Sequence, residues 1–468
     1  MRSHFITSAL TIALAFSGSI VPAVGETIVT PTATQQQTSE IDRTIEEGHR
    51  LLKEGSVESL RKAIVQFEKA LGLARLGNKE LDQIASLTSL GRVYIELHEY
   101  QKSLDYYNQS LELIQKRGRG YESIKVTVLN RIGLMYNKLG KYQNSLKYYN
   151  QSLIISRSVK ERPQEAIILN NIGLNHYSLG EIQKALEYYN QALVIAKSLG
   201  DQSDEGLIIS NFALVYSLQG ELQKSLEYYN RALSIYQLLD KKSHEGKILN
   251  NIGAIYSKLG DDRKALEYYN RGLPLLRVAN NLSWEANTLN NIGKLYSDLG
   301  ENQKALEYYN RALPILLGID DRSIAATTLN NIGLVYSELG EREKALDYYD
   351  QSLRLHRAVG SRKGEATTLN NIGMFYIGVG EKNKALNYLN QSLMLSHVVG
   401  DRQSEALTLH NIASVMRDQQ QPELAIALYK RSVNIYESIR KDNENFRRNY
   451  ATHIPKALHQ LIKLLLIS

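Results

Sequence analysis

The sequence contains no cysteine, which excludes a disulfide framework, a thiolate metal site and a cysteine nucleophile in this chain. Proline is scarce as well, with 7 residues in 468, as expected if most of the chain is helical. Aromatic residues are few and unequal, since 30 tyrosines stand beside 6 phenylalanines and a single tryptophan. A bias towards one aromatic residue indicates one motif that has been copied many times.

Charge of one sign is not concentrated anywhere in the chain. The formal net charge is +7, but acidic and basic residues alternate along the sequence. A nucleic-acid-binding protein more often gathers its basic residues on one face or in one run. We therefore expect no nucleic-acid partner.

The only long apolar run lies at the N-terminus. Arg2 gives a short basic start, residues 5–21 are uncharged and apolar, and small residues precede Glu26. This order is typical of a cleavable secretory signal peptide, and the run is short for an uncleaved membrane anchor, which is the alternative. We expect a signal peptide over residues 1–25 that is cleaved near Gly25.

The mature chain is then expected to be exported, periplasmic or secreted, and to have no contact with a membrane. Residues 26–40 are polar and rich in threonine and glutamine, which predicts a disordered lead-in.

The rest of the sequence is a repeat with a period of forty residues. Segments of the type LNNIG recur so that asparagine or a substitute stands at 130, 170, 210, 250, 290, 330, 370 and 410. A less regular copy occupies residues 87–100, and a divergent one lies near residues 41–80. Because repetition at this period is the signature of a stacked array, we expect about ten units over residues 41–440.

Each unit has the pattern of two helices. In the unit at residues 324–360, Leu329, Ile332 and Tyr336 share one helical face, and the pattern ends at Gly340, a residue suited to a helix C-terminus. A second apolar stripe follows. One helix pair cannot bury both stripes, whereas stacked pairs can. The sequence therefore predicts an all-α solenoid of stacked antiparallel helix pairs.

Side-chain size predicts how the pairs pack. Gly333 and Ala345, with their equivalents, are expected where the two helices of a unit approach closely. The tyrosines are expected to fill wider gaps between units and to leave their hydroxyls near solvent.

The order Leu, Ile-Gly, Tyr, Ala, Tyr and Ala or Ser resembles the tetratricopeptide repeat, here lengthened to forty residues. The length is similar to that of the repeats of kinesin light chains and Pins-type adaptors. The sequence LNNIGLVYSELGEREKALDYYDQSL resembles bacterial repeats that precede caspase-like CHAT domains. The resemblance covers residues 41–440. It implies a right-handed superhelix whose first helices line a concave groove that binds a protein or peptide segment.

The C-terminal segment carries a second resemblance. Residues 435–468 are similar to the helical join between such repeats and a CHAT domain, so residues 441–468 are expected to form a capping or linker helix. The catalytic domain itself has no counterpart in the chain. This leaves an alternative function, in which the repeats regulate a separately encoded caspase-like partner.

No constellation of residues indicates catalysis. His176, His244, His356 and His397 have no carboxylate or second histidine at metal-ligand spacing within one helix, and we expect them to be structural. No glycine-rich phosphate loop or serine nucleophile context is present, and the carboxylates are expected to be exposed beside lysines. We expect no enzyme activity, no cofactor and no metal, although an unrecognised site remains an open alternative.

The paired asparagines are the candidate site. Asn330 and Asn331 flank the side of the first helix opposite its apolar stripe, so stacked units would present carboxamides to the groove. A carboxamide has one acceptor and two donors and can pair with an extended peptide backbone. The predicted peptide-binding residues are Asn171, Asn211, Asn251, Asn291, Asn331, Asn371 and Asn411, with Asn170, Asn250, Asn290, Asn330 and Asn370 beside them.

A structural alternative exists for these asparagines. One of each pair can bond to the neighbouring helix and fix the stacking angle, and we expect one use for each position, with ligand contact at the second asparagine.

Groove positions such as Thr327, Leu334 and Met374 are small or apolar, which favours a weakly charged extended ligand over a phosphate-rich one. Trp284, at the start of one first helix, is expected to pack, or else to anchor a ligand.

Overall fold

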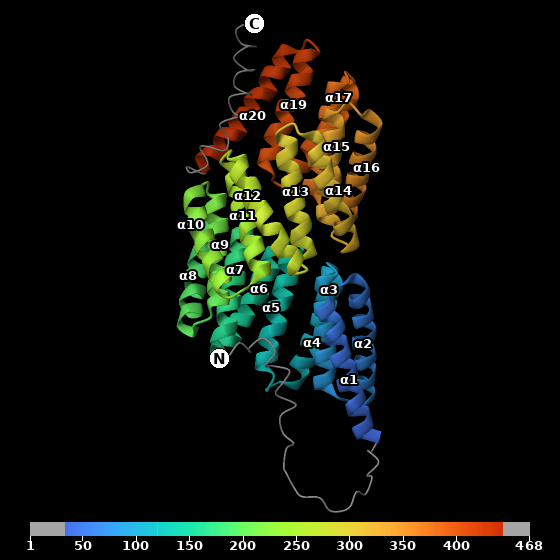
Figure 1. The fold of residues 1–468 in the computed structure, drawn as a ribbon, viewed down its shortest axis with the longest axis vertical. Coiled ribbons are helices and arrows are strands. Elements are labelled where there is room, and N and C mark those ends of the chain that lie inside the picture. Colours follow the sequence, from blue (N-terminus) through green and yellow to red (C-terminus); the bar gives the residue numbers. More distant parts are fainter. Residues whose placement is uncertain (1–32, 119, 443–468) are drawn as a thin grey trace, which may run out of the picture. The chain divides into compact units, whose positions relative to one another are not determined.

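The computed structural model of the protein describes residues 33–118 and 120–442, and every regular element within them is an α-helix (Figure 1). The predicted all-α class is confirmed. The chain forms two compact units, residues 1–211 and 212–468, and the boundary falls inside α9. Within the described residues, none of the helices is both long enough and apolar enough to span a bilayer.

The described residues of the first unit contain α1 (Ala33–Glu54), α2 (Val57–Leu76), α3 (Glu80–Glu96), α4 (Tyr100–Arg117), α5 (Glu122–Lys138), α6 (Tyr142–Ser158), α7 (Arg162–Ser178), α8 (Ile182–Leu199) and the start of α9 (Gln202–Leu218). Those of the second unit continue with α10 (Leu222–Leu238), α11 (Lys242–Lys258), α12 (Asp262–Val278), α13 (Leu282–Asp298), α14 (Asn302–Gly318), α15 (Arg322–Glu338), α16 (Arg342–Ala358), α17 (Arg362–Gly378), α18 (Lys382–Val398), α19 (Arg402–Asp418) and α20 (Pro422–Asp442).

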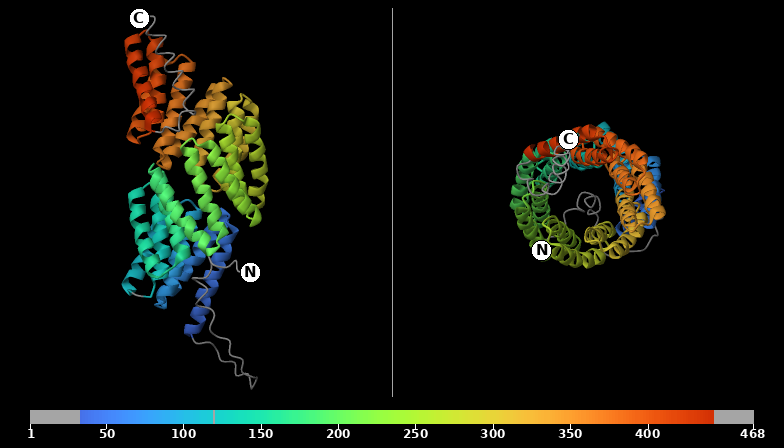
Figure 2. Two further views of the ribbon diagram at one scale, coloured as in Figure 1. Left: turned by 90° about the vertical axis from the view of Figure 1, so that its left-hand side faces the viewer. Right: turned by 90° about the horizontal axis from the view of Figure 1, so that it is seen from above.

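The helices pack in consecutive antiparallel pairs, as the views in Figure 2 show. Apart from α9, which the unit boundary divides, an odd-numbered helix makes its most extensive contacts with the even-numbered helix that follows it, as α7 does with α8 and α15 with α16. Within each unit an even-numbered helix also packs on the first helix of the next pair, as α16 does on α17. Contacts therefore join near neighbours along the chain, which is the arrangement of a solenoid and confirms the stacked pairs.

Tight left-handed turns end the helices where the sequence predicts them. Gly340 has a φ of 76°, and the N–H of Glu341 donates to the carbonyl of Tyr336 at 2.9 Å. This closes the last turn of α15 in the manner of a Schellman motif. Lys160 and Asp240 occupy the equivalent turn position without being glycine, and they adopt positive φ values of 59° and 51°.

Glycine allows the two helices of a pair to approach closely. A Cβ built on Gly333 would lie only 2.7 Å from Cδ1 of Tyr349, whose side chain is 1% exposed. The ring of Tyr349 packs on the glycine of its own pair and also against Leu369 and Ile372 of the next unit, so it fills the space between units as expected. Because the whole side chain is buried, its hydroxyl does not lie near solvent. A second set of tyrosines stacks in pairs and stays partly exposed, as Tyr336 does on Tyr348 with ring centroids 5.4 Å apart.

The first helix begins earlier than the sequence predicts. The lead-in expected over residues 26–40 is helical from Ala33 onward, because the segment ATQQQTSE has no glycine or proline and contains alanine, glutamine and glutamate, which favour helices. Ile41, which is fully buried, then anchors the helix to its neighbours. The predicted signal peptide at residues 1–25 and the C-terminal segment at residues 443–468 lie outside the described residues.

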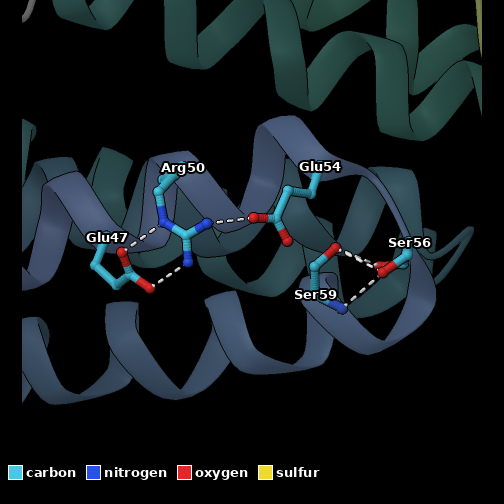
Figure 3. A network of polar contacts seen from close by, with 5 residues as sticks. All are labelled: Glu47, Arg50, Glu54, Ser56 and Ser59. Carbon is cyan, nitrogen blue, oxygen red and sulfur yellow. Dashed lines mark hydrogen bonds and ion pairs between the residues drawn. The ribbon is translucent and has the colours of Figure 1, made fainter.

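Two separate groups of polar contacts lie at the end of α1 and at the start of α2 (Figure 3). Arg50 donates two hydrogen bonds to Glu47, at 2.7 and 2.8 Å, and also pairs with Glu54. The hydroxyl of Ser56 accepts from the N–H of Ser59 at 3.0 Å and so caps α2. The exposed ion pairs add little stability, whereas the cap defines where the second helix begins.

Candidate functional site: the first-helix face

The odd-numbered helices expose one stripe each. On α15 this stripe consists of Thr327, Asn331, Leu334 and Glu338, which follow one another at helical spacing and are partly or fully exposed. Successive odd-numbered helices contact each other, as α11 does with α13 and α15 with α17, whereas no successive even-numbered helices make comparable contact among the described residues. The odd-numbered helices therefore lie on the inner, concave side within each unit. We call their combined stripes the first-helix face.

The first asparagine of each pair does not reach this face. These first asparagines are almost completely buried. This corrects the prediction that they bind a peptide directly. The exposed fractions are 5% for Asn170, 3% for Asn250, 8% for Asn290, 5% for Asn330 and 8% for Asn370.

The asparagines instead bond to each other across successive units. Nδ2 of a second asparagine donates to Oδ1 of the first asparagine one unit earlier, and we call each such hydrogen bond a rung. The rungs join Asn171 to Asn130 at 3.0 Å, Asn211 to Asn170 at 2.7 Å, Asn291 to Asn250 at 3.0 Å, Asn371 to Asn330 at 3.0 Å and Asn411 to Asn370 at 2.9 Å. Each rung contributes on the order of 1 kcal/mol, and its loss would leave a buried acceptor unpaired. The rungs match the stacking alternative for the first asparagines.

The second asparagines keep polar atoms available at the surface. A rung uses one N–H of a carboxamide that has two N–H groups and an acceptor oxygen. Residues 171, 211, 251, 291, 331 and 371 are all partly exposed, whereas Asn411 is buried with 6% exposure. Asn331 accepts a long hydrogen bond of 3.4 Å from Asn330 and also interacts with the hydroxyl of Tyr309.

Asn251 stands apart from the other second asparagines. Residue 210, at the first position one unit earlier in the sequence, is a serine and supplies no carboxamide oxygen. Asn251 is partly exposed and makes no hydrogen bond through its side chain among the residues that the structure describes. Its whole carboxamide is thus available on the first-helix face.

His176 is one of two histidines that have an acidic neighbour which the sequence did not indicate. Nδ1 of His176 lies 2.6 Å from a carboxylate oxygen of Glu181. Hydrogen bonds from Lys184, which has the larger effect, and from His176 lower the pKa of the Glu181 carboxyl group. His176 also stacks on Tyr188 with ring centroids 5.2 Å apart, just as a tyrosine does at this position in other units. The pair therefore follows from a tyrosine-to-histidine exchange in a structural stack.

The other three histidines have separate environments. Burial lowers the pKa of His356, which packs over Gly364 and whose Nδ1 has no hydrogen-bond partner. His244 stacks on Tyr236, with ring centroids 4.7 Å apart. His397 is exposed and lies 3.4 Å from Glu405. In the described part of the chain, no group of three or more metal-ligating side chains comes together.

Some carboxylates are more buried than expected. Glu165, Glu285 and their equivalents lie at the junction between successive pairs, where the sequence predicted exposed carboxylates beside lysines. Glu165 accepts from Arg157 at 2.8 Å, and Glu285 accepts from Arg277 at 2.6 Å. These ion pairs join a second helix to the next first helix, and they leave the inner face free of these carboxylates.

Comparisons with known proteins agree with this geometry. A tetratricopeptide repeat model matches residues 125–198, 204–277, 324–396 and 364–438, which together make up more than half of the chain. Two further tetratricopeptide repeat models match residues 286–315 and 84–117. All of these matches are to the repeats, and they lend no support to the CHAT resemblance. A search of curated proteins finds no match.

Several solved structures share the fold at low identity. A Rap protein complexed with competence and sporulation factor is 17% identical, with a TM-score of 0.55 over 77% of this chain and 99% of that one. The apo quorum sensor NprR from B. thuringiensis is 18% identical, with a TM-score of 0.51 over 74% and 99%. A Rap conjugation gene regulator in complex with a peptide is 14% identical, with a TM-score of 0.51 over 70% and 96%. At these identities the likeness extends to the helical solenoid alone.

Proposed function

The chain belongs to the tetratricopeptide repeat family, and from this premise we propose that it is a non-catalytic scaffold that holds an extended peptide segment against its first-helix face. Two similar structures give an external reason, because one is bound to a peptide and the other to competence and sporulation factor. Those ligands belong to those proteins. For this chain the proposal depends on its own inner face.

The observation that carries the proposal is the unused hydrogen-bonding capacity of the second asparagines. At Asn371 the rung holds the carboxamide in place and leaves an acceptor and a donor, whereas Nδ2 of Asn291 also donates to Asn287 at 3.3 Å and leaves the acceptor oxygen. At Asn251 the whole carboxamide is unused within residues 33–118 and 120–442. A carboxamide fixed in this way can pair with both the N–H and the C=O of an extended backbone, whatever the side chains of the ligand. Prior fixation also reduces the entropy lost on binding.

The proposal predicts that Asn251→Ala weakens binding without weakening the fold. Two lost hydrogen bonds of about 1 kcal/mol each reduce affinity roughly thirtyfold. The ligand is a peptide selected by the wild-type chain from a random display library, and affinity is measured by titration calorimetry. The melting temperature should stay unchanged because the side chain of Asn251 makes no hydrogen bond to any residue that the structure describes. A full-affinity complex with the variant would contradict the role of this residue.

The same proposal excludes turnover of the bound peptide. The described inner face offers amides, small residues and lysines rather than a nucleophile placed beside a base. Control of a separately encoded caspase-like partner remains the alternative prediction. It depends on residues 435–468, most of which lie outside the described residues, and no structural observation favours it.

We also propose that the protein is exported after cleavage near Gly25. The support is the order of the first residues, a basic start followed by an apolar run and small residues. N-terminal sequencing of protein from the extracytoplasmic fraction should begin at Glu26 or within one or two residues of it. Recovery of chains that start at Met1 in the soluble cytosol would contradict export.

A further inference from the structure

Two lysines on α11 distinguish one part of the first-helix face. Lys247 and Lys258 lie on the same exposed stripe as Asn251. The position of Lys247 is uncharged in the neighbouring repeats, with leucine at 207, asparagine at 287 and threonine at 327 and 367. The position of Lys258 carries leucine at 218 and acidic residues at 298 and 338. Only α11 among these helices has a lysine at both positions.

Neither lysine has a carboxylate partner among the described residues. Nζ of Lys247 lies 5.7 Å from the ring centroid of Trp284, and Nζ of Lys258 donates to the hydroxyl of Ser217 at 3.0 Å. Surrounding protein atoms on the concave side lower the pKa of both lysines by burial, and no acidic group offsets this effect. Elsewhere on the same face Lys294 pairs with Asp298 at 3.1 Å.

Lys247 is partly buried and Lys258 is exposed, and each is a cation without a carboxylate partner among the described residues, which an anionic ligand could supply. The interaction of a partly desolvated cation with a carboxylate is stronger than that of a fully hydrated surface pair. Asn251 lies between the two lysines, one turn after Lys247, and its carboxamide is unused. This stretch of α11 thus combines two cations with a backbone-pairing group.

Helix geometry gives the spacing of the charges. Eleven residues separate the two lysines, which corresponds to about 16 Å along α11 at a rise of 1.5 Å per residue. An extended peptide advances roughly 3.3 Å per residue, so about five residues cover that distance. The flexible lysine side chains allow the spacing to vary by about one residue.

We propose that Lys247, Asn251, Lys258 and Trp284 form a subsite for an acidic peptide with two carboxylates about five residues apart. Each lysine pairs with one carboxylate, Asn251 pairs with the backbone between them, and the indole of Trp284 borders the first lysine. The inference rests on the proposed peptide-binding function and adds the charge and spacing of the ligand. At α11 the expected ligand segment is therefore acidic, whereas the small and apolar residues Thr327, Leu334 and Met374 favour a weakly charged segment in later repeats.

The composition of the surroundings favours a peptide over a nucleic acid. Phosphate backbones are usually bound by a track of several basic residues. Here two lysines are separated by Asn251 and Ala254, and the next stripe on α13 contains Asn287 and the paired Lys294. Two isolated cations match two carboxylates better than a continuous row of phosphates.

The chain provides its own probe for a test, because Trp284 is its only tryptophan. The ligands are two capped Ser/Thr/Leu heptapeptides, one with glutamate at the first and sixth positions and one with glutamine there. At low salt the glutamate peptide should change the Trp284 emission and bind about a hundredfold more tightly than the glutamine peptide, roughly tenfold for each lysine. Affinities are measured in parallel by calorimetry on the full mature chain.

The variants separate the subsite from general electrostatics. Lys247→Met and Lys258→Met keep an apolar stem, and each should weaken the glutamate peptide about tenfold while leaving the glutamine peptide unchanged. Lys294→Met is the matched control on the adjacent stripe, and it should leave both affinities within about twofold.

If a heptapeptide binds, three results overturn the inference. The first is equal affinity for the two peptides. The second is tighter binding of a ten-residue oligothymidylate than of the glutamate peptide. The third is an equal loss of affinity in the Lys294→Met control. If neither heptapeptide binds but the library-selected peptide does, the subsite is wrong and the proposed function stands, whereas failure of all peptides removes both.

Discussion

Replacing Gly333 by valine is expected to lower the free energy of unfolding by about 2–3 kcal/mol, because added atoms in a close-packed core force their neighbours apart. Even the first added carbon would lie 2.7 Å from Cδ1 of Tyr349, and valine adds two methyl groups beyond it. Both residues belong to the packed interior between α15 and α16. Urea unfolding followed by circular dichroism measures the effect.

Gly333→Ala is the matched control, and the chain itself indicates its result. Alanine stands at the equivalent positions 213 and 413, each opposite a tyrosine, so a single methyl group can be accommodated there by a small shift. We expect this variant to lose less than about 1 kcal/mol of unfolding free energy, because the higher helix propensity of alanine partly offsets the cost of the shift. Equal losses for alanine and valine would contradict the packing account.

Tyr349→Ala should have the largest effect of any substitution considered, about 3–5 kcal/mol, since it removes a ring from a filled core. The side chain is 1% exposed and packs with Ala345, Leu353 and Leu369. The same urea titration measures the loss, with Tyr348→Ala as the control because that neighbouring ring is partly exposed.

Combining Tyr349→Ala with Gly333→Val tests whether the two positions share one space. The valine side chain then enters the volume that the ring has left, so the double variant should be more stable than the sum of the single losses predicts, by at least about 1 kcal/mol. Additivity to within about 0.5 kcal/mol would mean that glycine and tyrosine do not act on each other.

The fold was predictable because its determinants are local and repeated. The apolar stripe through Leu329 and Ile332, the helix end at Gly340 and the forty-residue period each follow from the order of residues in one unit. The close approach at Gly333 was also predictable, since only a small residue recurs there. The position of Tyr349 over that glycine was not, because it depends on the relative rotation of two helices.

The site was only partly predictable for the same reason. A single helix places Asn330 and Asn331 on either side of the exposed stripe and does not say which of them faces the next unit. The axial offset between successive first helices decides this, and it brings residues 41 apart together, as Asn371 and Asn330 show. The repeats around residues 327 and 367 do not predict Lys247 and Lys258, because the equivalent positions there are uncharged or acidic.

One comparison between adjacent residues tests the central claim most directly. Asn250 is 3% exposed and its Oδ1 accepts a hydrogen bond from Nδ2 of Asn291. Asn251 lies on the first-helix face, and its side chain makes no hydrogen bond among the described residues. Melting curves and binding isotherms are measured for Asn250→Ala and Asn251→Ala with the same library-selected peptide.

The account predicts opposite effects. Asn250→Ala should lose about 1 kcal/mol of stability, because it removes the 3.0 Å hydrogen bond from Asn291 and leaves that group only its 3.3 Å contact with Asn287, and it should bind with nearly unchanged affinity while folded. Asn251→Ala should melt like the wild type and bind roughly thirtyfold more weakly. If Asn251→Ala melts early and still binds its peptide with full affinity, the second asparagines are structural and the proposed binding face is wrong.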